Sequence, residues 1–272
     1  MPKIGCNTLL YGGHDLDTAL RYIALAGYAG IELSSVPGMA EHAELGRGRD
    51  YARALRAQVE SHGLECFHLG IHPQQLPEAE GQRRLMLSLE LASEMGVPLV
   101  LTGTSGYPQT EQAFAEAIAV LARAARRARE LGLRLGVKPH VGTPIYNTSS
   151  TLAMLRALHE DNVGLDFDVS HIYRAGEDPA AAFVALAPYV FTVRIRDAAS
   201  RALQIGPPEI QVPGRGEVDL LGVLRAMQAS GYAGDISLDV VGTFDYEPER
   251  ILALIAETRG WLRCALAQLN WS

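Results

Sequence analysis

The chain has 272 residues, of which 48% are hydrophobic and 20% charged, a balance typical of a globular protein that is long enough to bury a large core. Its formal net charge of −7 argues against nucleic acid or an anionic membrane as a partner, because both attract basic proteins. Three cysteines without CxxC spacing, no signal-peptide pattern and no long apolar run predict a cytoplasmic protein with reduced thiols and no membrane span.

Short apolar runs alternate with longer amphipathic runs along the whole chain. Eight of the short runs predict buried parallel strands: Lys3–Thr8, Gly30–Leu33, Leu64–Leu69, Leu99–Thr102, Arg134–Lys138, Val163–Asp168, Val190–Arg194 and Asp235–Val240. Helical periodicity follows each of them: Leu16–Ile23, Tyr51–His62, Leu85–Met95, Thr110–Leu131, Leu152–His159, Ala180–Ala187, Leu220–Ser230 and Pro248–Leu269. Asp15, Thr110, Asp178 and Asp219 are predicted N-caps, and Ser149 or Ser150 opens the fifth helix.

Eight strand–helix pairs fit either a closed barrel or a doubly wound sheet. The even spacing of the strands, and the absence of G-x-G-x-x-G after the first strand, favour the barrel. We therefore predict one domain, residues 1–272, folded as a single (β/α)₈ TIM barrel, a fold that runs to roughly 250 residues.

Polar side chains end most of the predicted strands. The last inward positions are Asn7, Glu32, His68, Thr102, Lys138, Asp168, Arg194 and Asp239. Chemistry in a barrel gathers at these C-terminal ends. The four last residues alternate in charge, and adjacent strands about 4.8 Å apart would let them pair. This ring either only closes the mouth or recognises an anion or a carbonyl; buried ion pairs add little stability on their own, which favours recognition. His140 and His171 follow strand ends and are plausible acid–base or substrate contacts.

Several segments together resemble one family: Gly27–Glu32, Leu135–Thr143, Gly164–His171 with its D-x-x-H, Val193–Asp197, Val212–Val218 and Gly231–Asp239. In this order they resemble the xylose isomerase-like TIM barrels, which include sugar phosphate isomerases and epimerases. The resemblance implies one divalent metal held by glutamate, aspartate, histidine and glutamate at the ends of strands five to eight. The corresponding positions here are Lys138, Asp168, Arg194 and Asp239.

Two of those four positions carry cations. Arginine offers no lone pair to a metal, and divalent ions prefer oxygen or imidazole ligands. Only Asp168 and, less well, Asp239 could serve as ligands. We therefore expect the metal implied by the resemblance to be absent or weakly bound, with no other cofactor.

The predicted activity is an isomerase, epimerase or lyase reaction on a sugar-like or keto-acid carbonyl compound, either neutral or anionic. Candidate catalytic residues are Lys138, Asp168, Arg194, Asp239 and His171. Candidate substrate contacts are Glu32, His68, His140 and Arg215. Glu32, His140, His171 or Asp239 could be the base, and Lys138 could instead act as base or form a Schiff base.

Two alternatives stay open. One is a metal enzyme with a rearranged ligand set of His140, Asp168, His171 and Asp239. The other is a non-catalytic relative that binds a ligand or a partner protein. The resemblance also suggests a homo-oligomer.

Overall fold

The strands close into a barrel. The computed structural model describes residues 2–72 and 76–271, and its strands form one sheet in the order β1-β9-β8-β7-β6-β5-β4-β2-β3, with β1 also paired to β2. The strands are β1 (Ile4–Asn7), β2 (Gly30–Val36), β3 (Ala40–Glu41), β4 (Glu65–Gly70), β5 (Leu99–Thr102), β6 (Arg134–Val137), β7 (Val163–Asp168), β8 (Val190–Ile195) and β9 (Asp235–Leu238). All pair in parallel except β3, which adds antiparallel to the end of β2. The predicted single (β/α)₈ TIM barrel is confirmed.

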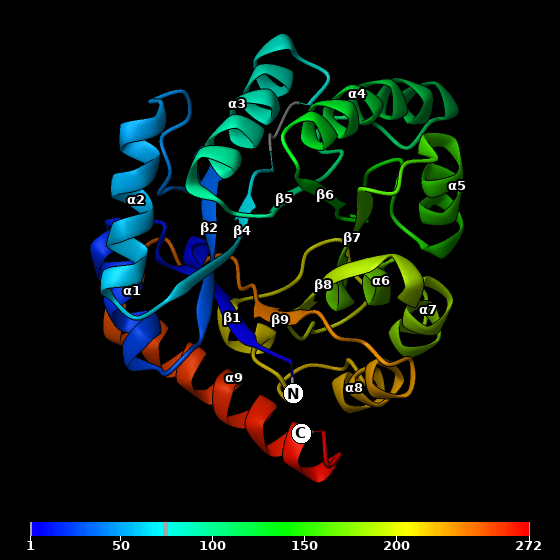
Figure 1. Ribbon diagram of the computed structural model, residues 1–272. Coiled ribbons are helices and arrows are strands. Elements are labelled where there is room, and N and C mark those ends of the chain that lie inside the picture. The colour runs from blue at the N-terminus through cyan, green and yellow to red at the C-terminus, as the bar shows by residue number, and fades with distance from the viewer. Residues whose placement is uncertain (1, 73–75, 272) are drawn as a thin grey trace.

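Helices form a ring outside the strands (Figure 1). They are α1 (Leu16–Leu25), α2 (Arg49–Ser61), α3 (Ala79–Met95), α4 (Glu111–Glu130), α5 (Thr148–Leu158), α6 (Val169–Arg174), α7 (Pro179–Leu186), α8 (Leu220–Ala229) and α9 (Pro248–Gln268). Short 3-10 turns lie at Thr8–Tyr11, Ala187–Tyr189 and Pro208–Gln211. In the described part of the chain no helix is long and apolar enough to cross a membrane.

Local capping explains where most helices begin. The side chains of Asp15, Thr110, Asp178 and Asp219 each accept a backbone N–H of the first turn, as predicted. The predicted cap of α5 was wrong: Asn147 is the N-cap, and the Ser150 hydroxyl bonds back to the backbone N–H of Asn147. This reciprocal capping box satisfies two helix-end donors at once.

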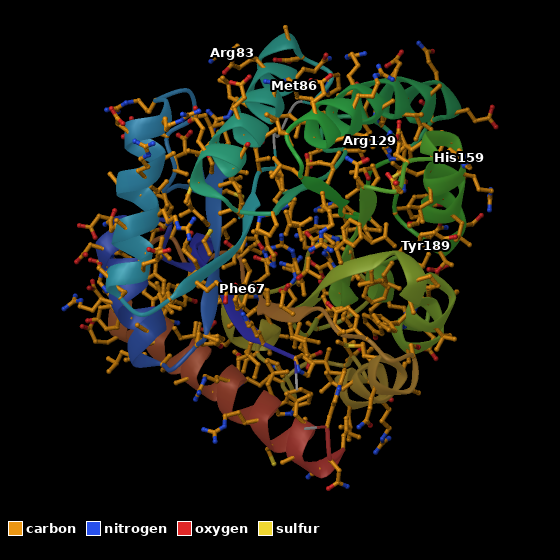
Figure 2. The ribbon with its side chains drawn as sticks, in the orientation of Figure 1. Phe67, Arg83, Met86, Arg129, His159 and Tyr189 are labelled. Carbon is orange, nitrogen blue, oxygen red and sulfur yellow. The ribbon has the colours of Figure 1, made fainter. Side chains whose placement is uncertain are left out.

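The strands separate an apolar outer layer from a polar interior. Along β7, Leu165 and Phe167 belong to the hydrophobic core, whereas Asp166 and Asp168 are fully buried and contact charged partners. This alternation is the two-residue period of a strand. Figure 2 shows side-chain nitrogen and oxygen atoms gathered inside the ring of strands. The barrel therefore encloses a network of charges rather than the usual layers of branched apolar side chains.

Candidate active site

A cavity of about 290 Å³ opens at the C-terminal ends of the strands. Its lining residues are Leu9, Val36, Met39, His72, Ser105, Lys138, His140, His171, Arg196, Asp239 and Val241. Lys138, His140, His171 and Asp239 were predicted from the sequence. The volume of this mouth pocket suits a small metabolite. One of its walls is apolar and the rest carries cations and imidazoles, a combination that is common in ligand sites.

Arg194 lies beneath the mouth pocket and not in it. Its side chain is 0% exposed. Nε lies 2.7–2.8 Å from both carboxylate oxygens of Asp166, Nη1 lies 2.8 Å from Asp239 Oδ2, and Nη2 lies 2.8 Å from Glu32 Oε1. Burial opposes the charge, but these carboxylates raise the pKa of Arg194 well above its usual value. Arg194, which was predicted to be catalytic, therefore directs its donors to carboxylates and not into the mouth pocket.

Lys138 forms the floor of the mouth pocket at the end of β6. Its Nζ donates to Asp239 Oδ2 at 3.2 Å and lies 3.7 and 3.8 Å from carboxylate oxygens of Asp168 and Asp166. Burial would raise the pKa of Asp239, but Arg194 and Lys138 hold it far below the usual range. Asp239 is therefore an anion. Both of its oxygens accept hydrogen bonds, Oδ2 from Arg194 and Lys138 and Oδ1 from Asn7 Nδ2.

Asp168 has a structural task as well as an electrostatic one. Its Oδ1 accepts the backbone N–H groups of Ser170 and His171 and so begins α6, a helix that was not predicted from the sequence. Its Oδ2 accepts Arg196 Nη2 at 2.9 Å. Burial would raise the pKa of Asp168, but Arg196 and Lys138 hold it below the usual range. The expected pairing of Asp168 with Arg194 was wrong, because Arg194 turns to Asp166.

His140 and His171 lie against each other in the mouth pocket, with ring centroids 3.8 Å apart. His140 Nδ1 lies 2.7 Å from the carbonyl oxygen of Val141. A carbonyl only accepts, so Nδ1 carries the proton and Nε2 keeps its lone pair. Burial lowers the pKa of His140 to about 4, which leaves the ring neutral at pH 7. In the described residues Nε2 of His140 has no hydrogen-bond partner.

His171 is surrounded by donors. Arg196 Nη2 lies 2.8 Å from its Nε2, and Arg174 Nη2 lies 2.9 Å from its Nδ1. Burial, and then the neighbouring His140 and Arg196, lower the pKa of His171 well below its usual value. A neutral imidazole accepts at one nitrogen only, so this wall of the mouth pocket has more donors than the protein can satisfy.

Three predicted substrate contacts lie outside the mouth pocket. Glu32 and His68 are buried inside the barrel, because β4 continues two residues beyond His68 to Gly70. His68 Nε2 lies 2.8 Å from Asp235 Oδ2, at the start of β9. Arg215 pairs with Glu257 of α9, with 41% of its side chain exposed. The loop before α8 therefore does not bring Arg215 to the site.

Three residues of the charge network were missed. Asp166 and Arg196 lie two positions from Asp168 and Arg194 in D-F-D and R-I-R, and the two-residue strand period places each pair on one face. That signal was available. His72 had none, since it follows β4 in a loop and reaches the mouth pocket only through tertiary folding. Burial, and then the cations Lys138 and Arg194, lower the pKa of His72 well below its usual value.

The residues present do not fit the divalent metal that the family resemblance implies. Arg194 and Lys138 already occupy the space between the carboxylates. Both oxygens of Asp168 and of Asp239 accept protein donors. Within residues 2–72 and 76–271, no three His, Cys, Asp or Glu side chains are grouped so that they could hold a metal. The rearranged ligand set of His140, Asp168, His171 and Asp239 is thus not assembled.

Comparison with known families supports the resemblance seen in the sequence. Residues 20–263 match the model of the xylose isomerase-like TIM barrel. The chain belongs to this family. Among solved structures, an L-ribulose 3-epimerase superposes with a TM-score of 0.77 at 19% identity, covering 100% of this chain and 99% of that chain. A structure of IOLI protein with a zinc atom gives a TM-score of 0.78 at 17% identity, covering 98% of both.

Two curated relatives share more sequence with the chain. It is 27% identical over 131 residues to an inosose dehydratase of Lacticaseibacillus casei, which covers 44% of each protein. It is 29% identical over 238 residues to a 3-dehydroshikimate dehydratase of Pseudomonas aeruginosa, which covers 83% of this chain and 36% of that protein. The chain therefore spans less than half the length of either relative.

Proposed function

We propose that this protein is an acid–base enzyme of the isomerase, epimerase or lyase type. It acts at the mouth pocket on a small sugar-like or keto-acid carbonyl compound, and it does so without a divalent metal. The observation that carries the proposal is that Arg194 and Lys138 contact the carboxylates where the family resemblance implies a metal, below a neutral His140 whose Nε2 has no hydrogen-bond partner among the described residues.

His140 is the proposed proton acceptor. Reactions of this type remove a proton from the carbon next to a carbonyl group. The lone pair on Nε2 of His140 would take that proton. The resulting imidazolium is a strong acid, because the pKa of His140 is about 4, and it would return the proton to carbon or to a departing hydroxyl group.

The negative charge that forms on the substrate oxygen needs a fixed partner. Lys138 Nζ lines the mouth pocket and keeps hydrogens beyond the one given to Asp239. In the described structure Arg196 Nη1 has no protein partner, although the other donors of the same guanidinium bind Ser170 and Asp168. These two cations would stabilise the enediolate oxygen in place of a metal. With the surplus donors around His171, they favour an anionic substrate.

The relatives support the same class of chemistry. They are named dehydratases and an epimerase, and both reactions can begin with proton removal beside a carbonyl. These names favour a carbonyl substrate with several hydroxyl groups.

Deuterium exchange tests the proposal without knowledge of the product. In D₂O, the wild-type protein should replace the C–H beside the carbonyl of at least one keto sugar or keto acid, measured by proton NMR. His140→Asn should slow that exchange by about 100-fold, the lower end of the contribution of a general base. His159→Asn is the matched control, because His159 is exposed at the end of α5.

Two outcomes of the exchange experiment would contradict the proposal. Equal exchange rates in the two variants would exclude His140 as the base, and no exchange across the panel would favour a non-catalytic binding protein. Elemental analysis tests the metal: one divalent ion per chain, retained after gel filtration, would contradict metal-free catalysis. Borohydride trapping of substrate on Lys138 would instead indicate a Schiff base.

A further inference from the structure

A row of charged side chains runs through the barrel from its N-terminal end to the mouth pocket. Asp235 Oδ2 lies 2.8 Å from His68 Nε2, and Glu32 lies on the other side of the same imidazole. Glu32 Oε1 then accepts Arg194 Nη2 at 2.8 Å, and Arg194 Nη1 reaches Asp239 at 2.8 Å. This row, here called the axial chain, comprises Asp235, His68, Glu32, Arg194 and Asp239.

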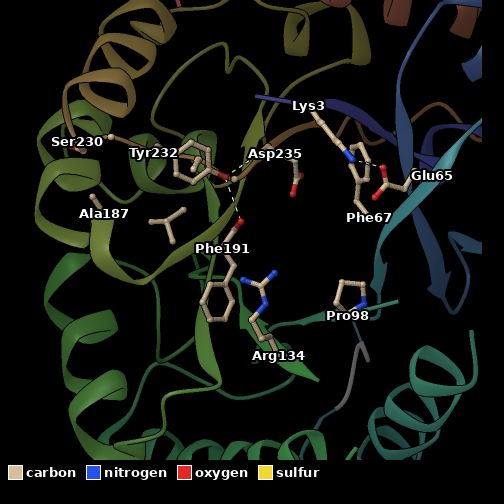
Figure 3. Close-up of a pocket in the computed structure, with 14 residues that line it drawn as sticks. Lys3, Glu65, Phe67, Pro98, Arg134, Ala187, Phe191, Ser230, Tyr232 and Asp235 are labelled. Atoms are coloured by element: carbon tan, nitrogen blue, oxygen red, sulfur yellow. Dashed lines mark hydrogen bonds and ion pairs between the residues drawn. The ribbon is translucent and has the colours of Figure 1, made fainter. Parts of the chain in front are cut away.

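The lower end of the axial chain meets solvent. A hollow of about 700 Å³ lies at the N-terminal ends of the strands, with Phe67, Arg134, Phe191, Tyr232 and Asp235 in its wall. Figure 3 shows Asp235 between Tyr232 and Phe67 in this hollow. The side chain of Asp235 is 18% exposed, whereas that of His68 is 1% exposed. Asp235 therefore links a solvent-accessible hollow to a buried imidazole.

One contact in the axial chain is incomplete. His68 Nδ1 and Glu32 Oε2 are both buried without a hydrogen-bond partner, and they lie 3.7 Å from each other. Buried polar atoms are almost always paired, because a buried donor or acceptor without a partner destabilises the folded state. Two orphaned atoms that face each other need only a small shift to bond, provided that Nδ1 carries a proton.

The surroundings of His68 favour that proton. Charged contacts to His68 among the described residues come from Glu32 on β2 and Asp235 on β9, and both are carboxylates. Burial alone would lower the pKa of His68, but Asp235 and then Glu32 raise it to about 10. With both nitrogens protonated, the ring donates to Asp235 below and faces Glu32 above. A neutral ring would turn a lone pair to one of the two anions.

We propose that His68 and Asp235 are positioning residues, which act through Glu32 and Arg194 to hold Asp239 and Lys138 beneath the mouth pocket. This inference rests on the proposed function for its effect on catalysis. Glu32 shares Arg194 with Asp166 and Asp239, so a loss of charge on His68 would change how Arg194 divides its donors. Lys138 would then lose the fixed carboxylate that orients it.

Asp235→Asn and Ser237→Ala form the test pair. Ser237 lies on β9 between Asp235 and Asp239, is fully buried, and its hydroxyl has no hydrogen-bond partner in the described structure, so its loss leaves the axial chain intact. Asp235→Asn should lower kcat about tenfold, because a change of one pKa unit at His68 corresponds to a factor of ten. KM should change by less than about twofold, because the substrate contacts are kept. Ser237→Ala should change neither constant.

NMR of the Arg194 guanidinium gives a second reading that needs no activity. In the wild-type protein, the Arg194 Nε–H signal should shift with the same midpoint as the His68 ring as the pH rises from 7. In Asp235→Asn both midpoints should fall together. The proposal would be overturned if the Arg194 Nε–H signal did not shift as His68 titrates, or if the two variants had equal kcat values. If wild type exchanges no carbonyl substrate, the proposed function fails, while the Arg194 signal still decides whether the axial chain couples.

Discussion

At the scale of single residues, Arg194 is the main difference between this site and the metal site that the family resemblance implies. A divalent ion at the mouth would present an open coordination position to a substrate, whereas a guanidinium spends its donors on the carboxylates around it. Arg194 therefore neutralises Asp166, Glu32 and Asp239 from below. In the proposed reaction, contact with the substrate would then fall to Lys138 and Arg196, which line the mouth pocket.

Removal of Arg194 should destabilise the protein severely. Arg194→Met would remove the cation that three buried carboxylates share, and breaking a buried pair in this way costs about 3–5 kcal/mol. Urea denaturation should show that loss in the free energy of unfolding. Arg215→Ala removes an exposed pair with Glu257 and should cost at most about 1 kcal/mol. Similar losses in the two variants would contradict the network described here.

The protonation of His140 makes a prediction about activity. Burial lowers the pKa of His140 to about 4, so the ring stays neutral, and able to accept a proton, well below the usual range of histidine. The exchange rate should therefore hold as the pH falls from 7 to 5 and decline as it falls through about 4. A decline centred near pH 6.5 in protein that is still folded would show that another group limits the reaction.

How well the sequence predicted a site residue depends on how deep that residue lies inside the barrel. The strand ends identified Lys138 and Asp239, because residue type and strand period suffice to place a side chain on the inner face. The strand ends did not indicate that the Arg194 side chain would lie below the mouth pocket, whereas that of Arg196, two residues later, lines it. That choice depends on which carboxylates each guanidinium meets across the barrel, and such contacts join residues far apart in the chain.

At the scale of elements, the strands were predicted closely and their irregularities were not. The bounds of β5 and β7 match the prediction, whereas β2 extends to Val36 and carries the added strand β3. The pairing of β2 with β4 shifts register after Ile31, so that Glu32 pairs with His68 and skips Phe67. Phe67 then lies against Gly5 and Gly30 at the N-terminal end of the barrel.

This packing makes Gly30 a test of the register shift. A Cβ on Gly30 would lie 2.4 Å from the carbonyl oxygen of Glu65 and 2.5 Å from the Phe67 ring. Gly30→Ala should therefore cost about 1–3 kcal/mol, as overpacking of a core does. Gly260→Ala in α9 meets nothing within 4 Å and should stabilise the helix by up to about 1 kcal/mol. Thermal unfolding of both variants would check this opposite pair, and a neutral Gly30→Ala would argue against the close packing of Phe67.

At the scale of the whole molecule, the polar barrel interior makes stability depend on pH in two directions. On the acid side, burial lowers the pKa values of His72, His140 and His171. An unfolded chain binds protons at these positions below about pH 6.5, where the folded chain does not. Stability should therefore fall as the pH falls below about 6.5. Asp168 and Asp239, whose pKa values are lowered, add a further loss below about pH 4.

On the basic side, the first loss of stability as the pH rises above about 6.5 should come from His68. Its pKa is raised to about 10, so the folded chain holds a proton that the unfolded chain has released above about pH 6.5. The stability from His68 is thus complete below pH 6.5 and is lost as the pH rises toward 10, by at most about 1.4 kcal/mol per pH unit. Urea midpoints between pH 6.5 and 7.5, about one unit below the pKa at which unfolded thiols ionise, should fall for wild type. They should fall much less for Asp235→Asn, which lacks the carboxylate that keeps His68 charged. A flat profile for wild type would mean that His68 is neutral, and that the barrel holds its carboxylates with Arg194, Lys138 and Arg196 alone.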